Sequence, residues 1–318
     1  AIDALAGREK VDIFMLHPKG RVSDVQRRQM TTVLAPNVHN IAIEGNFDDA
    51  QRLVKAMFGD AQFASRFTLS AVNSINWARL AAQIVYYFYS AVRLGAPERS
   101  VAFSVPTGNF GDVFAGYVAS QMGLPVARLI VATNINDILH RAMVAGDYSV
   151  GELTPTAAPS MDIQVSSNFE RLLFDMYDRD GDVMASVMRS FDESRSLRLD
   201  DRAHSRIGQL FSSARIDNDA MALAMRRASE EMDELIDPHT AIGLSAALSS
   251  DLAPDIPIET LATAHPGKFR DPVERATGHR PTLPPRVSGL FEREERYETL
   301  PGELQAIEAY IAERATET

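Results

Sequence analysis

The chain of 318 residues contains no cysteine. Disulfides, thiolate nucleophiles and cysteine-ligated metal sites are therefore excluded. The absence of cysteine also fits a reducing compartment, so we expect a cytoplasmic protein. Carboxylates and histidines are scattered without the spacing of metal ligands, and we expect no metal site.

Long apolar stretches are missing as well. The longest run without a charged residue is 15 residues, 113–127, and it contains glycine, serine and glutamine. A membrane span needs roughly 20 apolar residues, so we expect none. The first ten residues lack the basic start and apolar core of a signal peptide. They read like the middle of a helix, which leads us to expect a chain that begins partway through a fold.

The balance of charge is acidic, because 32 Lys and Arg residues face 43 Asp and Glu residues and give a net charge of −11. An acidic surface repels phosphate backbones, so we expect no nucleic-acid partner. A small anionic substrate is compatible with this charge, since a local site can oppose the overall field.

Short apolar runs of the strand type alternate with helical patterns in the first 134 residues. This alternation indicates parallel strands in an α/β fold. A long helix is predicted around residues 72–95, where Ile75, Leu80, Ile84, Val85 and Phe88 recur near helical spacing. Residues 168–250 are mostly helical in pattern, 257–266 resembles a late strand, and 301–315 a terminal helix.

The stretch PTGNFGD, residues 106–112, joins an apolar strand to the start of a helix. Backbone N–H groups at such a turn converge on one point, and the helix dipole adds partial positive charge, so an anion such as phosphate is the natural ligand. Gly108 and Gly111 permit close backbone approach and positive φ. The spacing matches neither G-x-G-x-x-G nor a P-loop. On spacing alone, an ordinary tight turn that needs glycine for its geometry remains open.

The residues of this stretch resemble the phosphate-cradling loop of threonine synthase, a pyridoxal-phosphate (PLP) enzyme of fold type II. Other segments resemble the same family in its order, from about residue 10 to about residue 290. They are HPKGRVSDVQ (17–26), NSINWARL (73–80), GLPVARLIVATNIND (123–137), PSMDIQVSSNFERLLF (159–174), DPHTAIG (237–243) and TAHPGKF (263–269).

The resemblance implies an enzyme that converts O-phospho-L-homoserine and water to L-threonine and inorganic phosphate, with PLP as cofactor. The residues that it implies for cofactor binding are Gly108, Asn109, Phe110, Gly111, Asp112 and Thr263, of which Thr263 would meet the pyridine nitrogen. The residues implied to face the substrate are Asn73, Ser74 and Asn76.

The resemblance also implies the architecture of fold type II. It consists of two unequal α/β domains with mostly parallel sheets and a cofactor cleft between them. We expect residues 1–68 to be the remainder of the smaller domain, and residues 69–318 to form the larger PLP-binding domain with C-terminal helices. The segment LTPTAAPSMDI, residues 153–163, is a candidate for a loop over the site, and an ordinary surface connection is an equal alternative.

A lysine that holds PLP covalently and also moves protons is required in such enzymes. The chain has only four lysines, Lys10, Lys19, Lys55 and Lys268. In the family this lysine stands in a Phe-Lys-Asp setting that precedes a Ser-Gly-Asp-Thr-Gly motif, and neither is present. Lys268 is nearest to the predicted site, but its counterpart in the family is not the PLP-bound lysine. We therefore expect no catalytic lysine here, and no activity of this chain alone.

Several polar residues near these motifs have alternative roles. His239 and His265 each stand beside a proline, and a local hydrogen bond is favoured over acid–base chemistry. The substrate phosphate needs a cationic partner, and the sequence does not choose between Arg79 and Arg171.

Two other functions are alternatives to the threonine synthase hypothesis. The first is a non-catalytic phosphate-ligand binding or scaffold protein derived from that family, which the missing lysine supports. The second is a different PLP-dependent lyase or dehydratase, against which the NSIN and TAHPGKF segments argue. Neither the oligomeric state nor the regulation follows from the sequence.

Overall fold

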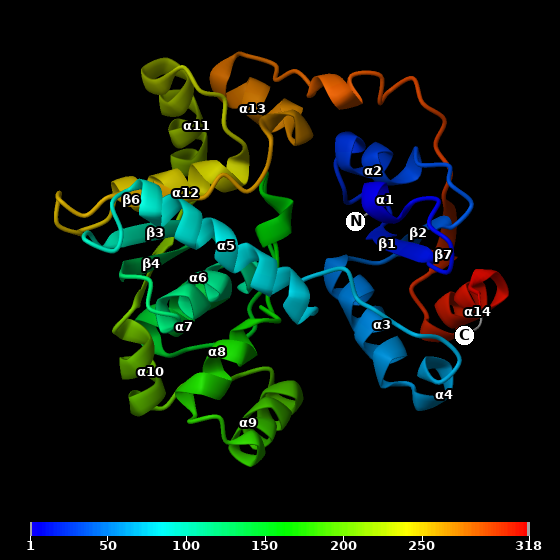
Figure 1. Ribbon diagram of the computed structural model, residues 1–318, viewed down its shortest axis with the longest axis horizontal. Helices are drawn as coiled ribbons and strands as arrows, with labels where there is room; N and C mark the ends of the chain where they lie inside the picture. The colour runs from blue at the N-terminus through cyan, green and yellow to red at the C-terminus, as the bar shows by residue number, and fades with distance from the viewer. Residues whose placement is uncertain (1, 317–318) are drawn as a thin grey trace. The chain divides into compact units, whose positions relative to one another are not determined.

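The computed structural model of the chain describes residues 2–316. Its internal contacts divide the chain into two compact units (Figure 1). The smaller unit combines residues 1–72 with 282–318, and the larger unit contains residues 73–281. No helix within the described residues is long and apolar enough to cross a membrane.

The smaller unit is built on a three-stranded parallel sheet with the order β1-β2-β7. Its strands are β1 (Ile13–Pro18), β2 (Val38–Glu44) and β7 (Glu298–Pro301), and its helices are α1 (Ile2–Leu5), α2 (Asp24–Thr31), α3 (Phe47–Gly59), α4 (Ala61–Ala64) and α14 (Leu304–Arg314). After the larger unit, the chain returns to the smaller unit as residues 282–318, called here the returning segment, and the short helix η3 (Pro285–Val287) lies in it.

The C-terminal segment belongs to this smaller unit, whereas the sequence had placed it with the larger domain. The reason is strand pairing, because β7 adds to β2 with Ile41 opposite Glu298. Ile307 and Ile311 of α14 then pack with Ile41 in one buried cluster. The sequence boundary at residue 68 lies close to the break at residue 72, but the return of residues 282–318 is a feature that the sequence did not indicate.

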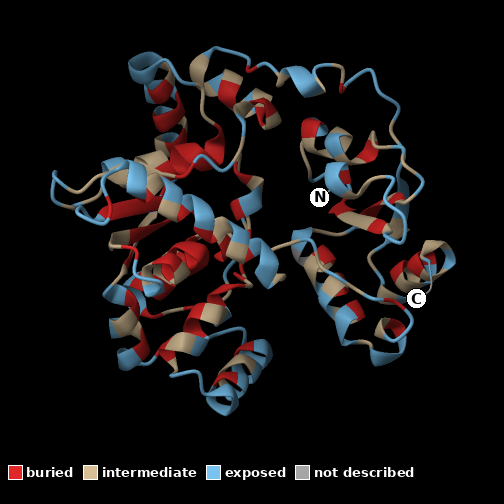
Figure 2. Cartoon of the chain, viewed as in Figure 1, coloured by how far each residue is buried: buried red, intermediate tan, exposed pale blue. Residues whose placement is uncertain are grey.

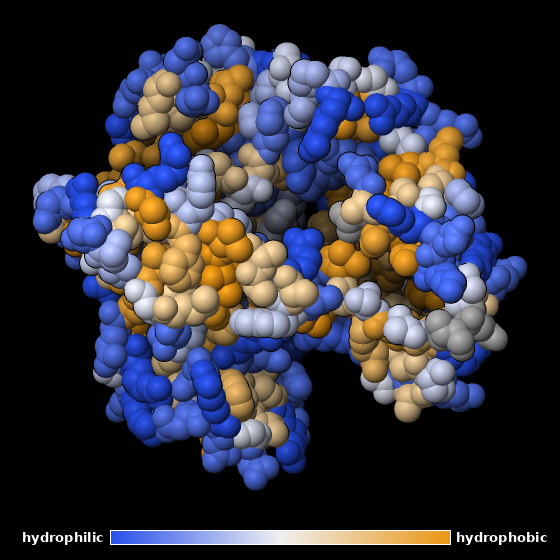
Figure 3. All heavy atoms as spheres, in the orientation of Figure 1, coloured by the Kyte–Doolittle hydropathy of each residue, from blue (hydrophilic) through white to orange (hydrophobic). Residues whose placement is uncertain are grey.

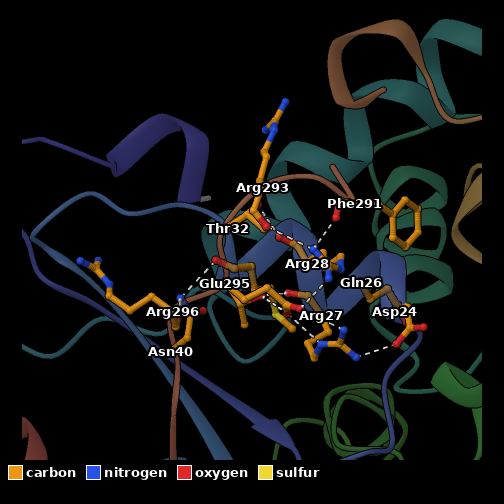
Figure 4. A network of polar contacts seen from close by, with 12 residues as sticks. Asp24, Gln26, Arg27, Arg28, Thr32, Asn40, Phe291, Arg293, Glu295 and Arg296 are labelled. Carbon is orange, nitrogen blue, oxygen red and sulfur yellow. Dashed lines mark hydrogen bonds and ion pairs between the residues drawn. The ribbon is translucent and has the colours of Figure 1, made fainter. Parts of the chain in front are cut away.

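A network of polar contacts ties the returning segment to α2 (Figure 4). Glu295 accepts hydrogen bonds from Arg27 Nε at 2.8 Å, Arg27 Nη2 at 3.1 Å and Thr31 Oγ1 at 2.7 Å. Arg28 Nη2 lies 3.2 Å from the same carboxylate. The Arg27 guanidinium holds the pKa of Glu295 below its ordinary value, against the opposing effect of partial burial.

Removal of this charge by Glu295→Gln is expected to destabilise the protein by about 1.5–3 kcal/mol at neutral pH, the range for hydrogen bonds to charged groups. A lowered pKa in the folded state stabilises at pH values above the unfolded pKa, and this contribution disappears as the pH falls through the folded value. The two proteins should thus differ in urea unfolding at neutral pH and converge in acid. Glu294→Gln, next in the chain and exposed, is the control. A Glu295→Gln protein as stable as the control at neutral pH would contradict the role of the network.

The larger unit contains a four-stranded parallel sheet with the order β5-β4-β3-β6. Its strands are β3 (Val101–Pro106), β4 (Val126–Thr133), β5 (Phe211–Arg215) and β6 (Ile258–Thr260). Successive strand residues point to opposite faces. Leu129 and Val131 accordingly join one buried cluster, and Ile130 and Ala132 join another.

Helices cover both faces of this sheet, as expected for parallel strands (Figures 1 and 2). The helices whose residues share the cluster of Leu129 are α5 (Trp77–Arg93), α6 (Gly111–Gln121), α7 (Ile138–Ala145), α8 (Phe169–Met176), α9 (Gly181–Ser194) and α10 (Asp201–Gly208). Those that share the cluster of Ile130 are α11 (Asn218–Met232), α12 (Pro238–Leu248) and α13 (Arg270–Thr277).

The predicted long helix is confirmed as α5, but its expected apolar face is only partly the buried one. Leu80 and Ile84 are buried, whereas Val85 is 66% exposed. Tyr89 and Val92 continue this exposed side at helical spacing, and Figure 3 shows apolar side chains on the surface over α5. Helical spacing therefore identified the element but did not identify the face that packs on the sheet.

The predicted late strand, 257–266, is reduced to the three residues of β6. Pairing with β3 ends where the Leu261 N–H donates to the Ser104 carbonyl at 3.0 Å. The chain then leaves the sheet and forms the short helix η2 (Pro266–Lys268). The early end of β6 releases residues 263–269 from the sheet, and several of them line the cavity described next.

Candidate functional site

The junction between β3 and α6 is the PTGNFGD stretch. Strand β3 ends at Pro106, α6 begins at Gly111, and no side chain of residues 2–316 caps this helix. Within the described part of the chain, the backbone N–H groups of residues 108–112 have no hydrogen-bond partner. A buried helix start with free N–H groups is a binding site for an anion.

The two glycines of the junction allow close packing against neighbouring segments. A Cβ atom on Gly108 would lie 2.5 Å from the carbonyl oxygen of Ser160, and one on Gly111 would lie 3.0 Å from Ser74 Cβ. A Cβ atom closer than 3.0 Å to a backbone atom is not tolerated unless the backbone shifts. Only glycine therefore fits at position 108 beneath the segment that contains Ser160.

Positive φ is found at Phe110 rather than at the glycines, contrary to the expectation from sequence. Phe110 has φ 62° and is 1% exposed. A left-handed conformation is unfavourable for a bulky residue and persists only where packing enforces it. Its ring packs against Phe169 and Phe211, with centroids 5.3 and 5.8 Å away. The aromatic core therefore holds the turn in the conformation that frees the N–H groups.

A cavity of about 230 Å³ contains this turn, and its lining residues all belong to the larger unit. Every residue predicted to bind the cofactor lines it, namely Gly108, Asn109, Phe110, Gly111, Asp112 and Thr263. Of the three residues predicted for the substrate, only Ser74 does so. The lining also includes Ser160 and Met161 of the expected loop, the histidine and lysine weighed from sequence, His239 and Lys268, and Gln83, which the sequence reasoning did not select.

Asn73 and Asn76 instead shape the segment around Ser74. The Asn73 side chain accepts a hydrogen bond from the Ile75 N–H at 2.9 Å. The Asn76 side chain accepts one from the Ala78 N–H at 3.0 Å and caps α5. Both amides therefore position the Ser74 segment at the start of α5.

The segment 153–163 does reach the site, because Ser160 and Met161 in the short helix η1 (Pro159–Met161) line the cavity. Asp162 fixes this segment. Its carboxylate accepts hydrogen bonds from Asn134 Nδ2 at 2.8 Å, Asn136 Nδ2 at 3.0 Å and the Thr156 N–H at 2.7 Å. The expectation of a loop over the site is confirmed for its second half.

Asn109 presents an unused acceptor in the wall of the cavity. Its backbone carbonyl accepts hydrogen bonds from the Asn168 N–H at 3.1 Å and from Asn168 Nδ2 at 2.9 Å. Its side-chain Oδ1 is buried and has no partner within the described residues. Buried polar atoms are nearly always paired, so an orphan acceptor in a cavity wall indicates a ligand.

Asp112 is held by two tyrosines of α5. Tyr86 Oη and Tyr87 Oη donate to Asp112 Oδ1 at 2.6 and 2.9 Å. Burial raises the pKa of Asp112, and the two hydroxyl donors partly offset this rise. Burial and the neighbouring Asp112 charge raise the pKa values of both tyrosines, so their hydroxyls stay protonated donors.

His239 is a buried histidine in the cavity wall. Its Nδ1 donates to Asp237 Oδ1 at 2.7 Å, and its Nε2 accepts from the Ser160 N–H at 3.3 Å. Burial raises the pKa of Asp237, but hydrogen bonds from His239 and Thr240 outweigh it, so the net pKa is lowered. His265 Nδ1 accepts from the Gly267 N–H at 3.0 Å. The expectation of local hydrogen bonds is confirmed for both histidines.

Two positively charged side chains line the cavity. Arg79 and Lys268 both line it, and their side chains have no ion pair among residues 2–316. Arg171 is engaged elsewhere, because its Nε donates to Asn168 Oδ1 and its Nη2 to the Ile75 carbonyl, at 2.9 and 2.8 Å. The structure thus separates two arginines that the sequence had left equivalent.

Thr263 lies beyond the end of β6, is exposed, and lines the cavity. Its hydroxyl has no hydrogen-bond partner in the described part of the chain. The side chain is therefore free to bond a ligand.

Known proteins are similar to this chain in both sequence and structure. The family described as "Pyridoxal-phosphate dependent enzyme" matches residues 3–198, and "Threonine synthase, C-terminal" matches residues 240–311. The threonine synthase of Pseudomonas aeruginosa is 53% identical over 98% of this chain and 67% of its own length. That of Corynebacterium glutamicum is 40% identical, over 99% and 67%.

Solved structures agree with these matches. PLP-bound threonine synthase from Brucella melitensis superposes with a TM-score of 0.90 at 48% identity, over 99% of this chain and 68% of that one. Threonine synthase from yeast gives a TM-score of 0.86 at 35% identity, over 99% and 67%. The chain thus spans about two thirds of the length of these relatives. On these matches, the chain belongs to the threonine synthases within the fold type II family of pyridoxal-phosphate-dependent enzymes.

Proposed function

We propose that the chain carries the cofactor and substrate site of a threonine synthase, which converts O-phospho-L-homoserine and water to L-threonine and phosphate. The observation that carries this proposal is the presence, in one cavity, of the uncapped start of α6 and of two cations, Arg79 and Lys268, that have no ion-pair partner among the described residues. A cofactor and a substrate that each carry a phosphate require two neighbouring anion-binding groups, and the helix start and the cations are two such groups.

The cavity wall fits PLP in three respects. Among the described residues, the N–H groups of residues 108–112 are free and suit its phosphate, the buried Oδ1 of Asn109 lacks a donor, and the Thr263 hydroxyl is available for the pyridine nitrogen. When bound, PLP supplies an electron sink for carbanion chemistry at the substrate. The hydroxyl of Thr263 does not ionise near neutral pH, so it offers the ring nitrogen a hydrogen bond without a negative charge.

The substrate phosphate is assigned to Arg79. A guanidinium offers paired N–H donors that match phosphate oxygens, and Arg171 is already bonded to Asn168 and Ile75. Ser74 lies in the same wall, and Asn73 and Asn76 would orient it through the turn that they cap. In this proposal only Ser74 faces the substrate, which revises the expectation that Asn73, Ser74 and Asn76 would all do so.

The cellular setting is part of the same proposal. The absence of cysteine supports a cytoplasmic location. The net charge of −11 supports a small-molecule substrate without a nucleic-acid partner. The larger unit would be the PLP-binding domain.

The lysine that holds PLP is not expected among the four lysines of the chain. Lys268 lies in the cavity wall, but its place in the TAHPGKF segment is not that of the family's PLP-bound lysine. We therefore expect this chain alone to bind PLP reversibly and to form no threonine. Borohydride reduction followed by peptide mass spectrometry should find no PLP on Lys268, and a labelled Lys268 peptide would overturn this assignment.

The activity is tested in a fusion of this chain with the part of the Pseudomonas aeruginosa threonine synthase that has no counterpart here. Equal amounts of L-threonine and phosphate from O-phospho-L-homoserine are expected, with this chain alone as the inactive control. Phosphate release without threonine would favour a different PLP-dependent lyase. Bound PLP without turnover would favour the non-catalytic alternative.

A further inference from the structure

Asn168 is a buried residue that contacts the turn between β3 and α6 without lining the cavity. It directly precedes α8 and is 1% exposed. Its backbone N–H and its Nδ2 both donate to the Asn109 carbonyl, at 3.1 and 2.9 Å. A carbonyl oxygen has two lone pairs, so both are used here. The peptide group between Asn109 and Phe110 is therefore held in one orientation.

This orientation decides where the N–H group of Phe110 points. In a trans peptide the C=O and N–H bonds point in opposite directions. The Asn109 carbonyl faces Asn168, so the Phe110 N–H faces away from Asn168, and it has no partner in the described part of the chain. Ser166 has the same effect one peptide earlier, because its Oγ donates to the Gly108 carbonyl at 2.8 Å. Two successive N–H groups are thereby left for an anion.

Arg171 determines which way the Asn168 amide faces. Its Nε donates to Asn168 Oδ1 at 2.9 Å, and its Nη2 donates to the Ile75 carbonyl at 2.8 Å. A guanidinium offers only donors, and the Asn109 carbonyl only accepts. Both are satisfied in a single orientation of the amide, with Oδ1 on Arg171 and Nδ2 on Asn109. Because Ile75 follows Ser74 in the cavity wall, the same arginine also holds the segment proposed to face the substrate.

We propose that Asn168 is a positioning residue for the cofactor phosphate, which directs the Phe110 N–H toward it, and that Arg171 acts through Asn168 by fixing its amide. Donors that are held in place before the anion arrives lose no further freedom when it binds, which strengthens binding. The inference rests on the proposed function, because the anion in question is the phosphate of the proposed cofactor. It adds two residues that do not touch that phosphate but determine how tightly it is held.

The test compares PLP with pyridoxal, which has the same ring but no phosphate, by equilibrium dialysis with the chain and its variants. Asn168→Leu removes the donor, keeps a side chain of similar size and adds no charge. It should weaken PLP binding by about tenfold or more, the scale of one hydrogen bond to a charged group. Pyridoxal affinity should stay within about threefold of the wild type, and the phosphorus-31 NMR signal of bound PLP should shift.

Arg171→Met tests the second half of the proposal, because it removes the guanidinium and leaves Asn168 free to turn its amide. It should shift the same phosphorus-31 signal and weaken PLP binding by about threefold or more. Asn40→Leu is the matched control. Asn40 is 3% exposed, and its Nδ2 donates to the Met30 carbonyl at 3.1 Å in the smaller unit. This variant should keep the wild-type affinities and signal.

Circular dichroism establishes that each variant is folded. A folded Asn168→Leu protein with wild-type PLP affinity and phosphorus-31 signal overturns the inference. Equal losses of PLP and pyridoxal affinity also overturn it, because they indicate general damage to the cavity. If Asn168→Leu does not fold, an unchanged signal in Arg171→Met is the overturning result. If the wild-type chain itself binds PLP no more tightly than pyridoxal, the phosphate site fails, and the proposed function fails with it.

Discussion

Replacement of Gly111 by aspartate is expected to abolish PLP binding, with a loss of affinity of about 100-fold or more, equivalent to about 2.8 kcal/mol or more. Two effects act together. The new Cβ would lie 3.0 Å from Ser74 Cβ and 3.3 Å from Leu80 Cδ2, so these side chains must move away by a few tenths of an ångström. The new carboxylate would also stand at the point where the N–H groups of α6 attract an anion. Equilibrium dialysis of the chain with PLP measures the change.

Gly181→Asp provides the matched control for this variant. Gly181 is also the first residue of a helix, α9, and a Cβ there meets nothing within 4 Å. The control protein should bind PLP as the wild type does. Circular dichroism and thermal unfolding establish that the Gly111→Asp protein is folded. If the Gly111→Asp protein is folded and its PLP affinity is unchanged, the junction between β3 and α6 is not part of the cofactor site.

Thr263→Asp is expected to keep PLP bound but to change the protonation of the cofactor. A carboxylate beside the pyridine nitrogen favours the positively charged ring and typically shifts such a pKa by about 1–3 units, whereas a hydroxyl lacks that charge. A protonated ring is a stronger electron sink and would favour side reactions such as transamination. Each unit of such a shift raises the ratio of protonated to neutral ring tenfold, so threonine formation by the fusion protein should fall.

Nitrogen-15 NMR of labelled PLP reports this protonation in the chain itself, without any turnover. The Thr263→Ser protein keeps the hydroxyl and should give the wild-type nitrogen signal, while Thr263→Asp should give the signal of a protonated ring. If the two variants show the same signal as the wild type, Thr263 does not contact the ring.

The sequence predicted the junction between β3 and α6 because both neighbours carry strong local signals. The apolar run of β3 is buried throughout, and the glycines mark the start of α6. By contrast, the strands β5 and β7 were not expected. The sequence of β5 is FSSAR and that of β7 is ETLP, and neither contains an apolar run. Each forms because a buried neighbouring strand supplies partners at the edge of a sheet.

The details of the site that sequence missed depend on contacts between distant segments. The left-handed turn falls on Phe110 because Phe169 and Phe211 enclose its ring. The choice of Arg79 over Arg171 depends on the partners that α8 and the Ser74 segment offer to Arg171. Local pattern carries no information on such pairings. For His239 the sequence indicated a local hydrogen bond from its place beside a proline, and the structure shows the partner to be Asp237, two residues before it.

The central claim is that the start of α6 holds the cofactor phosphate, and a crystal structure of this chain with PLP tests it most directly. The account predicts phosphate oxygens within about 3 Å of backbone nitrogens of residues 108–112. It also predicts the pyridine nitrogen at hydrogen-bond distance from the Thr263 hydroxyl, and no covalent bond to Lys268. PLP bound with its phosphate on Arg79 and Lys268, and with the N–H groups of residues 108–112 left free, would contradict it.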